Sequence, residues 1–197
     1  MTREYYIRTA SGKKFDYARG GENIVDVFDV AYHLSHIPRF CGACSPFISV
    51  AQHSVHVSLL IERRGGSYEL ALRGLLHDAH EAFFGDIPTP ALDYFFDMTG
   101  RDFKEVIVPG IDDAIVRMAD LKPIKPAEES LIKECDMIAL NAEGSRTIKG
   151  WINVPNVPTD STLVVTPMTP EASQRSFMER YMKLKAMRNK IRTPVNV

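Results

Sequence analysis

Hydrophobic residues recur three and four positions apart along most of the chain, which is the spacing of amphipathic helices. Six segments have this pattern and are predicted helices: 25–36, 50–61, 68–84, 102–121, 126–144 and 170–191. Pro126 suits the first residue of a helix, and Pro109-Gly110 predicts a kink or a division in the fourth segment. Gly85 ends the third segment, and the two prolines of residues 86–90 predict a turn or extended loop. The sequence therefore predicts an all-α bundle with long connecting loops.

Less regular segments complete this picture. Residues 13–16 predict a small hairpin, and the proline-rich stretch 155–170 predicts irregular chain in which residues 162–165 form a short strand. With 197 residues and no Gly/Ser/Pro-rich linker, we expect a single domain over 1–197. Its core would span about 14–144, and its C-terminal helix about 170–192.

Composition argues against a nucleic acid polymer or a membrane as the partner of this protein. The chain is 45% hydrophobic and 25% charged, with a formal net charge of −1, so no bulk positive field attracts a nucleic acid polymer. Residues 1–10 are polar and aromatic, unlike a signal peptide, and no apolar run approaches the roughly 20 residues that cross a bilayer. Three cysteines fit reduced thiols. We expect a cytoplasmic protein with no membrane partner.

The strongest chemical signal is the stretch Leu76-His77-Asp78-Ala79-His80-Glu81 in the third predicted helix. Adjacent helical residues point about 100° apart, so this imidazole and carboxylate can close on one metal ion from two sides. Glu81 shares the face of His77, where a carboxylate that is not a ligand can orient or deprotonate a water. The His77-Asp78 dipeptide, taken alone, also fits a hydrogen-bonded pair that holds the fold together without a metal ion.

Three residues elsewhere favour the metal site. His53 lies in the neighbouring predicted helix and can supply a third ligand, and Asp136 interrupts another apolar helix and can supply a fourth. Asp86 follows Gly85 near the C-terminal end of its helix, where the helix dipole does not favour a carboxylate. A second acid beside a metal site would explain it.

These segments resemble the HD-domain phosphohydrolase superfamily, and within it the small bacterial 5'-deoxynucleotidases and the phage-type HD hydrolases, which include dATP triphosphohydrolases. The matching stretches are Ser49–Ser54, Leu76–Glu81, Gly85–Pro90 and Glu134–Asp136, with His33–Ser35 and Arg39–Gly42 resembling the phage-type subgroup. The resemblance runs from about Lys14 to Gly144. It implies an HD-domain helical bundle and, by analogy, a homo-oligomer in the cytoplasm of a bacterial or phage-infected cell.

The resemblance also implies roles for individual residues. It makes His53, His77, Asp78 and Asp136 the metal ligands, Glu81 the residue that positions the attacking water, and Asp86 the acid that protonates the leaving oxygen. It places Arg39 on the substrate phosphate, where a guanidinium fork fits, and Phe40 where deoxynucleotidases have a tryptophan near the sugar. Thr89 falls in the substrate-side loop. Gln52 stands where many relatives have Glu.

The expected reaction is hydrolysis of a small deoxynucleotide. Mixed His and Asp ligands suit Zn²⁺, Co²⁺, Mn²⁺ or Fe²⁺ better than an all-oxygen Mg²⁺ site, although Mg²⁺ stays among the candidates, and a triphosphate tail can carry a further metal. The preferred substrate is a dATP-like dNTP, cut to deoxynucleoside and tripolyphosphate. The alternatives are a 5'-deoxynucleotidase acting on dNMPs, a non-catalytic nucleotide-binding HD module and, more weakly, a cyclic-nucleotide phosphodiesterase.

Other polar residues have competing interpretations. His56 and His80 are assigned to substrate contact. The alternative for both is a buried, hydrogen-bonded histidine, and a second-metal role also stays open for His80. His33, His36, Cys41 and Cys44 have the residue types of a structural zinc site, although Arg39 interrupts them. The basic residues of 175–192 predict a solvated helix face rather than a nucleic-acid surface.

Overall fold

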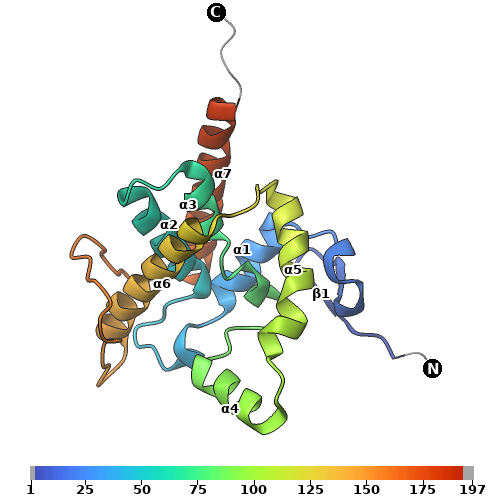
Figure 1. Cartoon of the computed structure of the whole chain (residues 1–197), viewed down its shortest axis with the longest axis horizontal. Coiled ribbons are helices and arrows are strands. Elements are labelled where there is room, and N and C mark those ends of the chain that lie inside the picture. The colour runs from blue at the N-terminus through green and yellow to red at the C-terminus, as the bar shows by residue number, and fades with distance from the viewer. Residues whose placement is uncertain (1–2, 193–197) are drawn as a thin grey trace, which may run out of the picture.

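The computed structural model of the protein describes residues 3–192, and helices dominate it (Figure 1). The α-helices are α1 (Val27–His36), α2 (Val50–Arg63), α3 (Tyr68–Leu75), α4 (Thr89–Thr99), α5 (Phe103–Ala119), α6 (Pro126–Thr147) and α7 (Pro170–Arg192). Three short 3-10 helices accompany them: η1 (Tyr17–Glu22) before α1, η2 (Phe40–Gly42) between α1 and α2, and η3 (Ala79–Phe83) between α3 and α4. Strands β1 (Tyr6–Arg8) and β2 (Lys14–Asp16) pair antiparallel, with Ile7 opposite Phe15. The all-α prediction is confirmed.

Side-chain caps fix where the site-bearing helices begin. The Ser49 hydroxyl accepts the N–H of Gln52 at the start of α2, and the Ser67 hydroxyl accepts that of Leu70 at the start of α3. Each cap satisfies one of the N–H groups that the first turn leaves without a partner. Pro126, as predicted, is the first residue of α6.

A single buried cluster runs from Phe15 in β2 to Leu184 in α7. Helix α7 lies along α1, α2 and α3, and α6 crosses α2 (Figure 1). A Cβ on Gly74 would lie 2.2 Å from Cδ1 of Ile61, so this glycine lets α3 lie directly against α2. The hairpin reaches η3 through Phe15, whose ring stacks on Phe83 with centroids 4.0 Å apart.

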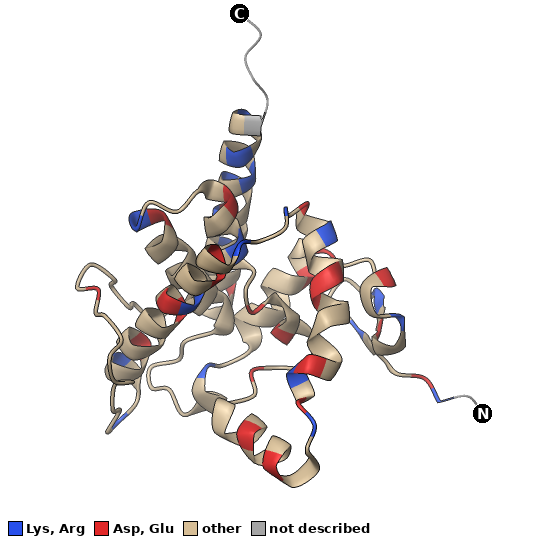
Figure 2. Cartoon of the chain, in the orientation of Figure 1, with Lys and Arg blue, Asp and Glu red and all other residues tan. Residues whose placement is uncertain are grey.

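The basic run of α7 is only partly a solvated face, which corrects the sequence prediction. Lys and Arg line the C-terminal end of α7 (Figure 2), yet Arg180 and Arg188 are only 6% and 4% exposed. Arg180 donates to Ser58 and pairs with Glu62 at 2.5 Å. Arg188 donates to the carbonyls at the end of α5. Both therefore tie α7 to the bundle.

Three predicted features of the secondary structure are wrong. The third helix ends at Leu75 instead of Phe84, and Thr89 is the first residue of α4 instead of part of a loop. Of the kink or division predicted at Pro109-Gly110, the division is absent: α5 runs through Pro109, which lies on the exposed side, where water can bond the freed carbonyl. Residues 162–165 form no strand.

Across residues 3–192, every helix is too short or too polar to cross a bilayer.

Candidate metal centre

A break in the chain between α3 and η3 positions the His77-Asp78 pair. Leu76 and Asp78 both leave helical geometry, with φ near −105° and ψ between 7° and 17°. The expectation that the pair lies within a continuous helix is therefore wrong. Because no proline or glycine marks residues 75–79, the break is held by tertiary contacts. The stacking of Phe83 on Phe15 is one of them.

The four residues predicted as metal ligands converge on one point. Nε2 of His53 lies 3.0 Å from Oδ1 of Asp136 and 3.8 Å from Oδ2 of Asp78. Nε2 of His77 lies 3.1 Å from Oδ2 of Asp78 and 3.8 Å from Oδ1 of Asp136. Ligands about 2.0–2.2 Å from a shared ion are themselves about 3 to 4 Å apart. His53, His77 and Asp136 have donor atoms within 4.8 Å of one another and Asp78 contacts both histidines, so the spacing fits a cation among these residues.

Both histidine rings are oriented for coordination. Nδ1 of His53 lies 3.0 Å from a Glu143 oxygen, and Nδ1 of His77 lies 2.8 Å from the carbonyl of Gly74. With the proton on Nδ1, the lone pair is on Nε2. Among residues 3–192, the two buried Nε2 atoms have no hydrogen-bond partner, and they face the carboxylates of Asp78 and Asp136.

The potential at this point is strongly negative. Burial lowers the pKa of His77, but the charges of Asp78 and Asp136 outweigh it and leave that pKa well above its usual value. Burial raises the pKa of Asp136, but its contacts with His53 and His77 reverse the shift and leave it low. Carboxylates that stay ionised beside nitrogen donors are the chemistry of a divalent cation site.

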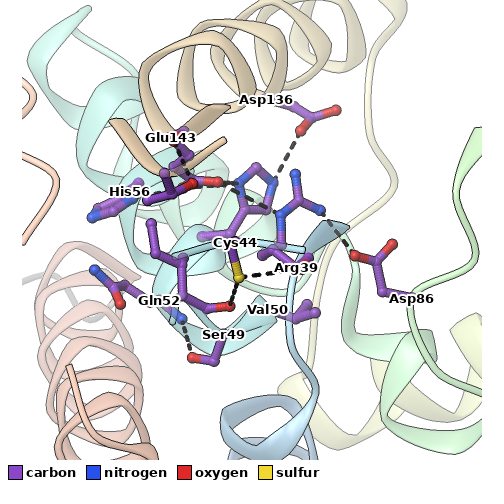
Figure 3. A network of polar contacts seen from close by, with 12 residues as sticks. Arg39, Cys44, Ser49, Val50, Gln52, His56, Asp86, Asp136 and Glu143 are labelled. Atoms are coloured by element: carbon purple, nitrogen blue, oxygen red, sulfur yellow. Dashed lines mark hydrogen bonds and ion pairs between the residues drawn. The ribbon is translucent and has the colours of Figure 1, made fainter. Parts of the chain in front are cut away.

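Glu143 is the central residue that the sequence analysis missed. It is fully buried, and its carboxylate bonds Nδ1 of His53 and, at 2.7 Å, Nδ1 of His56 (Figure 3). Nε of Arg39 lies 3.5 Å from the same carboxylate. Burial raises the pKa of Glu143, but these cationic partners outweigh it and hold that pKa well below its usual value. Its signal in the sequence is position, two helical turns after Asp136 on the same face of α6.

Arg39 bridges the metal centre and the predicted acid. It is buried between Glu143 and Asp86, whose Oδ2 lies 3.7 Å from Nη1 (Figure 3). The next residues, Phe40 and Cys41, have φ of 55° and 52°, a left-handed conformation that costs about 1–2 kcal/mol per non-glycine residue. The Cys44 thiol bonds the Arg39 carbonyl and fixes this turn. Strain kept next to a buried arginine indicates a functional position.

Glu81 lies beside the centre. It is 3% exposed, and Oε2 has no hydrogen-bond partner in the described chain. Burial raises the pKa of Glu81 to about 9, and the charges of Asp78 and Asp86 add to the shift. A bound cation would oppose that shift by favouring the carboxylate.

The remaining predicted substrate contacts are scattered. His56 lies on the far side of Glu143 (Figure 3), is buried and bonds that carboxylate through Nδ1, which favours the alternative of a buried, hydrogen-bonded histidine. His80 is buried beside Glu81, with Nδ1 3.2 Å from Asp112. Phe40 contacts Trp151 edge-on at 5.4 Å, and Thr89 lines a cavity of about 530 Å³ beside α4.

The alternative zinc array does not assemble. His33 accepts the N–H of Ala10 on Nε2 and donates from Nδ1 to the carbonyl of Ala82. Cys44 is buried and bonds backbone carbonyls, whereas Cys41 is exposed. Within residues 3–192, these side chains form no candidate metal group.

Comparison with known proteins supplies a relative. The chain is 33% identical over 187 residues to a protein of Escherichia coli (strain K12) that carries the description "Uncharacterized protein YfdR". The match covers 93% of this chain and 97% of that protein. The chain belongs to the YfdR family. No family model matches the sequence. The YfdR-family match spans the whole metal centre, from Arg39 to Glu143, but the description assigns no chemistry to it.

The residues present therefore fit a divalent cation. Two imidazole nitrogens with free lone pairs and two carboxylates match the donor set of Zn²⁺, Co²⁺, Mn²⁺ or Fe²⁺. Glu143 and the Gly74 carbonyl orient the imidazoles from behind, which is the support that metal-binding histidines usually have.

Proposed function

We propose that this member of the YfdR family is a metal-dependent phosphohydrolase of the HD type that acts on small deoxynucleotides. One observation carries the proposal: four donor atoms from α2, α6 and the α3–η3 turn converge at spacings of 3.0–3.8 Å. The Nε2 atoms of His53 and His77 lie 3.0 and 3.1 Å from the carboxylates of Asp136 and Asp78, yet within residues 3–192 neither contact has hydrogen-bond geometry, as donors that face a shared ion would have.

The residues around this centre suit phosphate-ester hydrolysis. A bound divalent cation would supply Lewis-acid neutralisation of a phosphoryl oxygen and a water of lowered pKa. Arg39 offers a guanidinium to the phosphate, held in place by Glu143 and Asp86. Glu81 orients and deprotonates the attacking water, and Asp86 gives a proton to the oxygen of the departing nucleoside. The presence of both acids favours an enzyme over a non-catalytic binding module.

A deoxynucleoside substrate is supported by resemblance and by an aromatic wall. Phe40 takes the place of the deoxynucleotidase tryptophan, and Trp151 packs against it from the loop after α6. Our preferred substrate is a dATP-like triphosphate, because residues 39–42 resemble the phage-type enzymes. We also propose that the enzyme works in the cytoplasm as a homo-oligomer.

The test is a screen of ribo- and deoxynucleoside mono-, di- and triphosphates with Mn²⁺, Co²⁺, Zn²⁺ and Mg²⁺, with products separated by ion chromatography. Tripolyphosphate from dATP is the expected product. Orthophosphate from dAMP without tripolyphosphate from dATP would instead make the protein a 5'-deoxynucleotidase. The absence of hydrolysis with every metal and nucleotide would refute the proposal.

Glu81→Gln is the matching variant. Because Glu81 is assigned to the water and not to the first cation, it should keep that cation and lose about 10²- to 10⁴-fold in turnover. Glu22→Gln, at a glutamate whose side chain is 77% exposed, should keep the wild-type rate. Full activity in Glu81→Gln would remove Glu81 from the mechanism.

A further inference from the structure

His80 is held in the same way as the two ligand histidines. Its Nδ1 lies 3.2 Å from the carboxylate of Asp112 in α5, which leaves the lone pair on Nε2. Its ring stacks on Phe84 with centroids 5.5 Å apart. The side chain is 93% buried, and within residues 3–192 its Nε2 has no hydrogen-bond partner. With its ring held in place and a lone pair free on Nε2, His80 can coordinate a cation through that atom.

Two carboxylates complete a group around this histidine. A ring nitrogen of His80 and one oxygen each from Asp78 and Glu81 lie within 4.8 Å of one another. Oε2 of Glu81 is buried and lacks a hydrogen-bond partner in the described chain. A purely structural cluster would not leave both a buried imidazole nitrogen and a buried carboxylate oxygen unpaired, because each costs about 1–3 kcal/mol.

A cavity lies next to the partner of His80. It has a volume of about 310 Å³, and Asp112 and His77 line it together with Arg73, Glu129 and apolar side chains.

We propose that Asp78, His80 and Glu81 bind a second divalent cation that shares Asp78 with the first. Two carboxylates and one imidazole are a harder donor set than that of the first centre, and suit Mn²⁺ or Mg²⁺. Glu81 would bind through Oε2 and leave Oε1 for the water. The proposal rests on the proposed function, because it needs the first cation on Asp78.

The experiment counts Mn²⁺ on the whole chain. Protein stripped with chelator is reloaded with Mn²⁺, desalted and analysed by elemental mass spectrometry and by electron paramagnetic resonance. We expect two Mn²⁺ per chain and an exchange-coupled spectrum, since paired metals lie about 3.5–4 Å apart. His80→Phe keeps an aromatic ring on Phe84 and should bind one Mn²⁺, with an uncoupled spectrum. His36→Phe, at an exposed histidine that stacks on Tyr32, should still bind two.

Each result is decisive. One Mn²⁺ in the wild type, or two in His80→Phe, would overturn the second site and leave the first intact. No bound Mn²⁺, Co²⁺ or Zn²⁺ in the wild type would remove both the site and the proposed function. If His80→Phe does not fold, Asp112→Asn removes the anchor alone and should weaken the second Mn²⁺ about 10- to 100-fold, with Asp113→Asn as the exposed control. Unchanged affinity in Asp112→Asn would refute the proposal.

Discussion

Replacing Glu143 by glutamine tests how the metal centre is held together. The carboxylate is fully buried and has three cationic or donor partners: His53 at 3.0 Å, His56 at 2.7 Å and Arg39 at 3.5 Å. The amide is nearly isosteric, so no cavity opens. What changes is the charge, and one acceptor oxygen becomes a donor that faces these partners.

The size of the effect follows from these contacts. Breaking a buried ion pair by removing one partner costs about 3–5 kcal/mol. Because the amide oxygen can still accept from one histidine, we expect Glu143→Gln to lower the free energy of unfolding by about 2–3 kcal/mol. His53 also loses the group that fixes its Nδ1 proton, so metal affinity should fall about 10- to 100-fold.

Two measurements separate these effects. Urea unfolding in the presence of EDTA gives the stability change without metal, and a competitive titration against a chromophoric chelator gives the metal affinity. Glu134→Gln is the matched control on the same helix, because its carboxylate is 45% exposed and pairs with Arg64 only at 3.7 Å. Wild-type stability together with wild-type metal affinity in Glu143→Gln would refute the role given to Glu143.

Three further predictions concern stability. Arg188→Ala should lower the free energy of unfolding by about 2 kcal/mol or more in urea, because it removes the donor to the carbonyl of buried Ala119, whereas exposed Lys190→Ala should change it by less than about 0.5 kcal/mol. Gly110→Ala should cost about 1–3 kcal/mol in the same assay, since a Cβ there would lie 2.8 Å from the Cα of Gly20; an unchanged midpoint would contradict that packing. Zn²⁺ or Mn²⁺ at 100 times its Kd should add about 2.7 kcal/mol, seen as a higher Tm that EDTA reverses; a Tm insensitive to metal would argue against a folded-state site.

The sequence predicted the helices well where hydrophobic spacing and a cap coincide. Helix α2 begins at Val50, as its Ser49 cap and apolar positions indicate, and α6 begins at Pro126. Helix α4 was missed because two prolines around Thr89 predicted a loop. Proline is tolerated in the first turn of a helix, where the N–H has no helical partner, so these prolines begin α4 instead of excluding it.

The sequence predicted the four residues that the structure brings together, but not the residues that hold them in place. His53, His77, Asp78 and Asp136 stand in motifs with family-specific spacing, so a resemblance finds them. Glu143 belongs to no such motif, and only its place two turns after Asp136 marks it. Pairings such as His80 with Asp112, and Arg39 with Glu143, join segments far apart in the chain, and only folding brings them together.

The turn between α3 and η3 positions the His77-Asp78 pair. In a continuous helix, the N–H of Asp78 would bond the Gly74 carbonyl, which could then not orient His77 in the same way. By ending at Leu75, the helix leaves the Gly74 carbonyl free to orient His77. The chain then restarts as a 3-10 helix, in which residues three apart lie on the same side, so Glu81 comes to lie beside Asp78. One local change in backbone geometry therefore places His77, Asp78 and Glu81, whereas α2 and α6 bring His53 and Asp136 to the same point.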